Sequence, residues 1–280
     1  MRIALISDIH ANILALESVM KAIKKHTPDM ILSLGDQVNL GPCPRETLEL
    51  LKSENVTCLH GNHERYVLSA MAGDPGYAGA NFACPRYHAS LLTAEQITFP
   101  KTLEIEGITF CHALPEDDRF PVFDPALALP KLRDMHFDKP THIICGHGHN
   151  PSHIRSGHVV IDSIGAVGCM DDGVPGTAPY VILTLEHGQA MLRPYYVSYN
   201  TKPMKDVFRQ GGMADYCPIM AHIICQQMMD NQDYLVRFVQ NALALSHARG
   251  ESIISEQTWQ DTDAGFDWPD GIDTAAFWKK

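Results

Sequence analysis

Five short motifs in the first 150 residues of this 280-residue chain carry side chains that can bind metal ions. They read DIH, GD, GNHE, CH and GHGH. Two carboxylates, four imidazoles and one amide oxygen form a ligand set that suits Mn, Fe or Zn, disfavours Cu(I), and contains too much nitrogen for Mg or Ca. Because seven donors exceed the needs of one tetrahedral ion, the set predicts two ions that share a carboxylate. The candidate ligands are Asp8, His10, Asp36, Asn62, His112, His147 and His149.

Each motif follows an apolar run that predicts a β-strand. The runs cover residues 3–6, 30–34, 56–59, 108–111 and 143–145. In sheets that are largely parallel, the residues just after the strands converge at one edge, although they lie far apart in the sequence. Residues two apart in an extended segment point to the same side, so Asp8 with His10, and His147 with His149, should each face one place.

The segments between the motifs indicate an α/β fold. A helix capped by Asn12 is predicted by apolar residues at helical spacing from Ile13 to Ile23, and a second helix is predicted over Pro44–Glu54. Together with the strands they complete a β-α-β-α-β pattern, which is typical of a parallel sheet with covering helices. Residues 70–100 are rich in Gly, Pro, Ala and Asn and predict a cap or loop, with a short helix over 94–99. A hairpin over 103–111 and further strands over 143–145, 158–161, 180–185 and 190–197 are expected after it.

The pattern changes after residue 200. Residues 205–247 have no strand pattern and predict two or three helices, and the last thirty residues are acidic and carry Trp259, Trp268 and Trp278. Indole rings in a tail suggest that the tail docks on the protein or on a partner. We therefore expect a domain over residues 1–200 and a helical extension over 201–280, whose tail acts as a packing strap or as the arm of a homo-oligomer.

Composition narrows the class of protein. Apolar residues make up 45% of the chain and charged residues 20%, which predicts a globular protein with a full core. The formal net charge of −11 argues against a general binder of nucleic acid or of anionic membranes. No charged leader precedes the first strand and no apolar run approaches the length of a membrane span, so the cytoplasm is the expected location. The eight cysteines are scattered and are expected to be reduced.

The chain resembles the calcineurin-like metallophosphoesterase superfamily over about residues 1–200, in particular its compact bacterial and archaeal phosphoesterases. The resemblance is carried by the ordered series DIH, GD, GNHE, a lone His after a strand, and GHGH. The resemblance implies a four-layer α-β-β-α sandwich, and hydrolysis of a phosphomonoester, a phosphodiester or a dinucleoside polyphosphate by a metal-bridging hydroxide at two divalent ions, most typically Mn. The resemblance implies that one ion is bound by Asp8, His10, Asp36 and His149, and the other by Asp36, Asn62, His112 and His147. It also implies that His63, which is not a ligand, assists the leaving group.

Departures from the superfamily pattern narrow the expected substrate. Protein phosphatases of this type carry GDxxDRG, whose second Asp orients the catalytic His and whose Arg grips phosphate, whereas this chain reads GDQVNLG, with Asn39 and Leu40 at those places. A dedicated protein phosphatase is therefore not expected. The turn over 162–168 reads DSIGAVG where relatives have an NPGS-like turn, and Gly148 replaces a commoner Thr or Ser.

Two other classes of function compete with the enzyme. A scaffold of the same fold could bind protein partners, as the metallophosphoesterase-like subunit of the retromer coat does, but the intact ligand set and His63 argue against a site without catalysis. A nuclease of the same superfamily is disfavoured because the sequence has no basic stripe. A small phosphate ester or nucleotide is thus the expected substrate.

Overall fold

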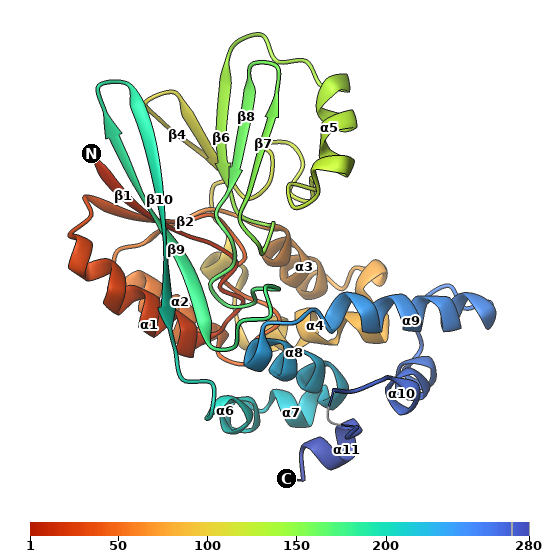
Figure 1. Cartoon of the computed structure of the whole chain (residues 1–280). Coiled ribbons are helices and arrows are strands. Elements are labelled where there is room, and N and C mark those ends of the chain that lie inside the picture. Colours follow the sequence, from red (N-terminus) through yellow and green to blue (C-terminus); the bar gives the residue numbers. More distant parts are fainter. Residues whose placement is uncertain (270, 280) are drawn as a thin grey trace.

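Two five-stranded sheets lie at the centre of the computed structural model, which describes residues 1–269 and 271–279 (Figure 1). The first sheet has the order β10-β9-β1-β2-β3 and the second the order β4-β5-β6-β8-β7. The strands of the first sheet are β1 (Arg2–Ile6), β2 (Met30–Ser33), β3 (Thr57–Cys58), β9 (Thr177–Glu186) and β10 (Gln189–Ser198). Those of the second are β4 (Thr102–Ile105), β5 (Ile108–Cys111), β6 (Thr141–Cys145), β7 (Ser152–Ser156) and β8 (Val159–Ser163).

Alternating side chains of β1 explain how the layers stack. Ile3 and Leu5 point into a buried cluster that also contains Phe110 and Ile144 of the second sheet, so the two sheets pack face to face. Ala4 and Ile6 point the other way, into the cluster formed with α1 (Ile13–Ile23). On the far face of the second sheet, α5 (Pro125–Asp134) buries Ala128 and Leu132 against β6 and β8. The expected α-β-β-α sandwich is confirmed.

The strand directions bring the motif-bearing ends together. β1 pairs in parallel with β2, from Ile3 opposite Met30 to Ile6 opposite Ser33, and β2 pairs in parallel with β3. In the second sheet, β5, β6 and β8 also run parallel. The five motifs lie at or directly after the ends of β1, β2, β3, β5 and β6, and the GNHE motif after β3 continues into the first turn of α3. A parallel core in each sheet therefore delivers every motif at a carboxyl end.

Most of the first predicted elements are confirmed. Asn12 caps α1, since its side chain accepts a hydrogen bond from Ala15 N at 3.2 Å, and α2 (Pro44–Ser53) has proline in its first turn, as expected. The predicted cap or loop over 70–100 is wrong in part, because it contains α4 (Ala83–Leu91) after α3 (Asn62–Met71). The segment expected as a short helix forms a 3-10 helix over Ala94–Ile97.

The buried face of α4 explains why its sequence did not predict a helix. It comprises Cys84, Pro85, Tyr87 and His88; three of these residues recur at helical spacing, but a proline and a histidine among them make the apolar signal weak. Pro85 lies in the first turn, where its missing N–H costs no helical hydrogen bond. His88 is fully buried and connects α4 to the GDQVNLG loop: Asn39 N donates to its Nδ1 at 3.0 Å, and its Nε2 lies 2.9 Å from Gly41 O. Tertiary contacts thus stabilise a helix that local propensity does not specify.

Helices follow residue 200, as the sequence predicts, but residues 204–248 form four of them instead of the expected two or three. The helices after residue 200 are α6 (Met204–Gln210), α7 (Met213–Tyr216), α8 (Pro218–Asp230), α9 (Leu235–Ala248), α10 (Glu256–Gly265) and α11 (Thr274–Phe277). Trp259 and Trp268 are buried in the same cluster of side chains as α1 and α8. Among the helices of the described residues, none is long and apolar enough to cross a membrane.

Candidate metal centre

The candidate ligands meet at the edge of the sandwich where the motif loops and the first turn of α3 come together. Three groups of side chains have potential ligand atoms within 4.8 Å of one another. They are Asp8 with His10 and His149, Asp36 with His112 and His147, and His10 with Asp36 and His63. Asn62 joins them, because its Oδ1 lies 2.8 Å from His112 Nε2. The structure therefore brings together every site residue expected from the sequence.

The backbone presents five of these side chains in a way that the sequence did not reveal. Asp8, His10, Asp36, His147 and His149 all have φ between 45° and 61°, in the left-handed region. The expectation that the paired ligands lie in extended segments was therefore wrong. For a residue other than glycine this region costs roughly 1–2 kcal/mol, and strain of this kind gathers at functional sites. Hydrogen bonds between the loops maintain it, for example from His10 N to Asp36 O at 2.9 Å.

Two motif glycines leave room for the carboxylates. A Cβ at Gly61, in GNHE, would lie 2.2 Å from Asp36 Oδ1. A Cβ at Gly146, the first glycine of GHGH, would lie 2.6 Å from Asp8 Oδ2. A larger residue at Gly61 would displace the Asp36 carboxylate, and one at Gly146 would collide with Ser7 Oγ, 1.8 Å from the added Cβ, as well as with Asp8. Both GNHE and GHGH therefore require glycine at the first position for steric reasons.

The first group has the geometry of an ion site. Nε2 of His10 and Nε2 of His149 lie 3.2 Å apart, and each lies 3.9 Å from Asp8 Oδ1. Within the described residues, Asp8 Oδ1 is buried and has no hydrogen-bond partner. Donors about 2.0–2.2 Å from a shared cation lie about 3–4 Å from one another, so the group fits a divalent ion. His149 Nδ1 lies 3.3 Å from Asp171 Oδ2, and this contact orients the ring.

The second group adjoins the first through Asp36. Asp36 Oδ2 lies 3.3 Å from His112 Nε2 and 3.9 Å from His10 Nε2, between the two groups. His112 Nδ1 donates to Leu34 O at 2.9 Å, which directs Nε2 of the same ring into the centre. This is the position that a carboxylate shared by two ions would occupy.

Glu64, the last residue of GNHE, supports the Asp36 loop, a role that the sequence analysis did not find. Its buried carboxylate accepts hydrogen bonds from Asp36 N at 2.9 Å, Gln37 N at 2.8 Å and Gly61 N at 2.8 Å. Burial raises the pKa of Glu64 to about 7, with the nearby charge of Asp36 as a further cause. Glu64 therefore holds the loop after β2 against the start of α3.

Asn39 orients His63. Asn39 Oδ1 accepts a hydrogen bond from Leu40 N at 2.9 Å, so its amide nitrogen faces His63 Nδ1 at 2.8 Å. An N–H donor at Nδ1 leaves the ring proton on Nε2, which lies 3.9 Å from Asp36 Oδ2. Burial lowers the pKa of His63 to about 4. In this structure His63 is thus a neutral imidazole that presents a hydrogen-bond donor to the centre.

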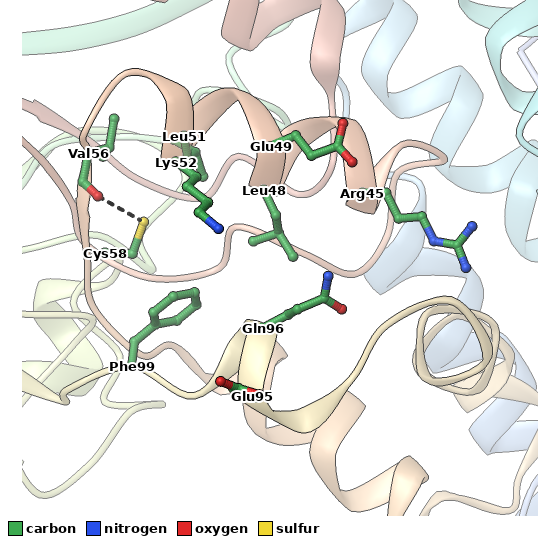
Figure 2. A pocket seen from close by; sticks show the side chains of 10 residues that line it. All are labelled: Arg45, Leu48, Glu49, Leu51, Lys52, Val56, Cys58, Glu95, Gln96 and Phe99. Carbon is green, nitrogen blue, oxygen red and sulfur yellow. Dashed lines mark hydrogen bonds between the residues drawn. The ribbon is translucent and has the colours of Figure 1, made fainter.

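One cavity of the protein lies away from the candidate metal centre and has no part in it. It measures about 600 Å³, lies between α2 and the segment around Gln96 and Phe99, and includes no candidate ligand (Figure 2). Its Cys58 thiol is 3.8 Å from Val56 O, and burial raises the pKa of that thiol to about 12. Cys58 is therefore a protonated thiol at neutral pH and not a reactive nucleophile.

Metal binding should release protons. Burial lowers the pKa of His112, but the charge of Asp36 has the larger effect and raises this pKa to about 10. Burial also lowers the pKa of His149, but its hydrogen bond to Asp171 helps to raise this pKa to about 9. Both rings are protonated at neutral pH without ions, whereas a ligand must be a neutral imidazole. We expect the apparent affinity for Mn²⁺ to rise about tenfold per pH unit for each proton released.

Titration calorimetry in buffers of different ionisation heat would count these protons. About one proton per ion is expected. An affinity that does not change between about pH 6 and pH 8 would contradict the assignment of His112 and His149 as ligands.

Comparison with known proteins agrees with this geometry. The model of the calcineurin-like phosphoesterase family matches residues 1–163, more than half of the chain, and the protein belongs to this family. A metallophosphoesterase from Sphaerobacter thermophilus is 28% identical, with 76% of this chain and 95% of that chain covered and a TM-score of 0.57. The hypothetical protein PH1004 from Pyrococcus horikoshii OT3 shares the fold, with a TM-score of 0.61, 15% identity, and 83% and 99% of the two chains covered.

A curated relative matches a shorter stretch. It is the uncharacterized protein MJ0912 from Methanocaldococcus jannaschii, which is 44% identical over 66 residues, or 24% of this chain. The match spans 27% of that protein's length.

Proposed function

We propose that this protein is a metal-dependent phosphoesterase that hydrolyses a phosphomonoester, a phosphodiester or a dinucleoside polyphosphate at two divalent cations, with Mn²⁺ as the expected metal. The observation that carries the proposal is the pair of adjoining side-chain groups on either side of Asp36. Membership of the calcineurin-like phosphoesterase family supports the same class of reaction. One cation would be held by Asp8, His10, Asp36 and His149, and the other by Asp36, Asn62, His112 and His147.

Cations bound by these side chains would supply Lewis acidity for phosphate-ester hydrolysis. Asp8 and Asp36 are buried carboxylates, and without cations the protonated rings of His112 and His149 only offset their charge, so the centre has no net positive charge to attract a phosphate. Substrate binding should therefore depend on prior binding of the cations. Glu64 keeps Asp36 in place through the backbone, so that the shared carboxylate does not reorganise during the reaction.

His63 would stabilise the leaving group. Its Nε2 proton faces the centre, and a neutral imidazole can donate a hydrogen bond to the departing oxygen. Asn39 occupies the place where protein phosphatases of the superfamily have the aspartate that orients this ring. The Asn39 amide favours the neutral form of the His63 ring, whereas a carboxylate at the same position would favour the protonated form of the ring. This difference supports small phosphate esters as substrates over phosphoproteins.

His63→Ala should retain its metals and lose activity. His63 is not needed to complete either ion group, so the metal content should stay that of the wild type, while kcat falls by about 10²–10³-fold. Elemental analysis and steady-state kinetics would measure the two effects. His153→Ala, which changes an exposed histidine on β7, is the matched control and should leave both unchanged. Loss of metal from His63→Ala would assign the ring to the ligands instead.

A substrate panel tests the function itself. The Mn-loaded protein should turn over p-nitrophenyl phosphate, its bis-ester or a dinucleoside tetraphosphate, and should be inactive on single-stranded DNA. Turnover of none of these would overturn the enzyme proposal in favour of a scaffold that binds protein partners.

We also propose that the division near residue 200 separates a metallophosphoesterase domain from a helical extension that packs on it. The cluster that joins α1 to α8 and to Trp259 and Trp268 supports this arrangement. A cytoplasmic location and a homo-oligomer formed through the extension remain predictions from the sequence.

A further inference from the structure

A second cavity adjoins the candidate centre. Its volume is about 320 Å³, and His63 and Asn39 form part of its wall. The other walls come from two regions far apart in sequence. Tyr66 and Phe82 lie on the side of α3 and α4, and the opposite side belongs to α8 and α9, which lie beside α4 in Figure 1. A group held here would therefore lie next to the side chain assigned to the leaving group.

The extension after residue 200 completes this cavity. Met220 of α8 and Leu235, Val236 and Val239 of α9 supply its aliphatic wall. These residues lie outside the segment that the family model matches, which ends at residue 163. The family motifs account for the ion groups, whereas this chain's own C-terminal helices shape the space beside them. Selection of the substrate is the function that such a wall would serve.

The chemistry of the walls points to a planar, partly polar ligand. Ring centroids of His63 and Tyr66 lie 5.1 Å apart and those of Tyr66 and Phe82 lie 6.2 Å apart, so aromatic surface extends from the centre into the cavity. Aromatic faces stack on nucleobases of any sequence. Two amides, Asn81 and Gln240, also line the cavity; the Asn81 side chain is half-buried and that of Gln240 is exposed at its rim.

An alkyl chain and a nucleobase differ in how they would satisfy this lining. The alkyl chain would fill the apolar space but would neither stack on the Tyr66 and Phe82 rings nor gain a hydrogen bond from the Asn81 and Gln240 amides, which would stay solvated. A nucleobase has two apolar faces for the aromatic and aliphatic walls, and donors and acceptors along its edge for the amides. The volume of about 320 Å³ falls in the range of small-molecule sites.

We propose that this cavity binds the nucleobase of a nucleotide substrate and thereby places the phosphate of the nucleotide at the ion groups beside His63. Placement of the phosphate at the ion groups rests on the proposed phosphoesterase function, whereas binding of the nucleobase does not. Binding of the base depends on the cavity and not on catalysis, so the two can be tested separately.

The binding test uses the full-length protein without metal and the probes adenosine and ribose. Saturation-transfer NMR should show binding of adenosine and not of ribose. Val236→Glu introduces a charge at a side chain that is 52% exposed, so the fold should tolerate it, and should weaken adenosine binding by about tenfold. Val174→Glu, the same change at a side chain that is 50% exposed and outside the cavity, should bind adenosine like the wild type. Gln240→Leu, on the exposed side of α9, provides a second variant and should also weaken binding.

The kinetic test uses Mn-loaded protein and compares two phosphomonoesters of a ribose 5-hydroxyl, AMP, which carries a nucleobase, and ribose 5-phosphate, which carries none. The nucleotide should have at least about a tenfold higher kcat/KM, and Val236→Glu should remove the difference. Equal binding of adenosine and ribose, or tighter binding of hexyl phosphate than of AMP, would overturn the nucleobase assignment. Adenosine binding without turnover of any ester would keep the cavity assignment and reject the proposed function instead.

Discussion

Asp36→Asn should fold like the wild type and hydrolyse phosphate esters about 10³-fold more slowly, because it removes about 4 kcal/mol of charge stabilisation from the transition state. Asp36 Oδ2 lies 3.3 Å from His112 Nε2 and 3.9 Å from His10 Nε2, so this carboxylate is placed to be shared by the two proposed cations. The amide keeps the shape of the side chain and loses its charge. Both cations should therefore bind more weakly. The metal content and kcat/KM, measured on the same sample, should fall together.

A matched control separates this effect from a general change in charge. Asp138→Asn makes the same substitution at a side chain that is 93% exposed and far from the centre in the fold, on the segment before β6. It should leave the metal content and the rate unchanged. If Asp36→Asn kept both metals and a rate within about tenfold of the wild type, the shared carboxylate would have to be another residue.

Phe238→Ala should destabilise the protein by about 3–5 kcal/mol, since it removes a fully buried aromatic ring and leaves a cavity. The Phe238 ring on α9 contacts the tail: ring centroids lie 4.7 Å from Trp259, 5.0 Å from Phe266 and 6.0 Å from Trp268. The loss should therefore loosen the packing of the tail as well as that of α9. Urea unfolding followed by tryptophan fluorescence would measure the free energy of unfolding.

Leu243→Ala is the control on the same helix. Its side chain is 41% exposed, so truncation should change the free energy of unfolding by no more than about 1 kcal/mol. A loss below about 1 kcal/mol for Phe238→Ala would mean that the aromatic cluster does not anchor the tail.

Elements with a strong local signal were predictable. The apolar runs of β1, β2 and β6 and the capped helix α1 appear in the structure within a few residues of their expected bounds. α4 and β7 were not predictable in this way: α4 buries His88 and Cys84, and β7 reads SHIRS, with a single apolar residue. Their stability comes from neighbours that are distant in the sequence, and a pattern within one segment contains no information on those neighbours.

The sequence alone determined which side chains form the centre, because residue types that bind metal recur after each strand and parallel strands end at one edge. Only the tertiary structure decided how these side chains are held. The left-handed backbone at Asp8 and Asp36, the contact of Asp171 with His149, and the cavity that α9 completes beside His63 all arise between segments that are distant in the chain. Such contacts depend on loop geometry and on packing across elements, whereas a motif specifies only the order and spacing of residues along one strand end.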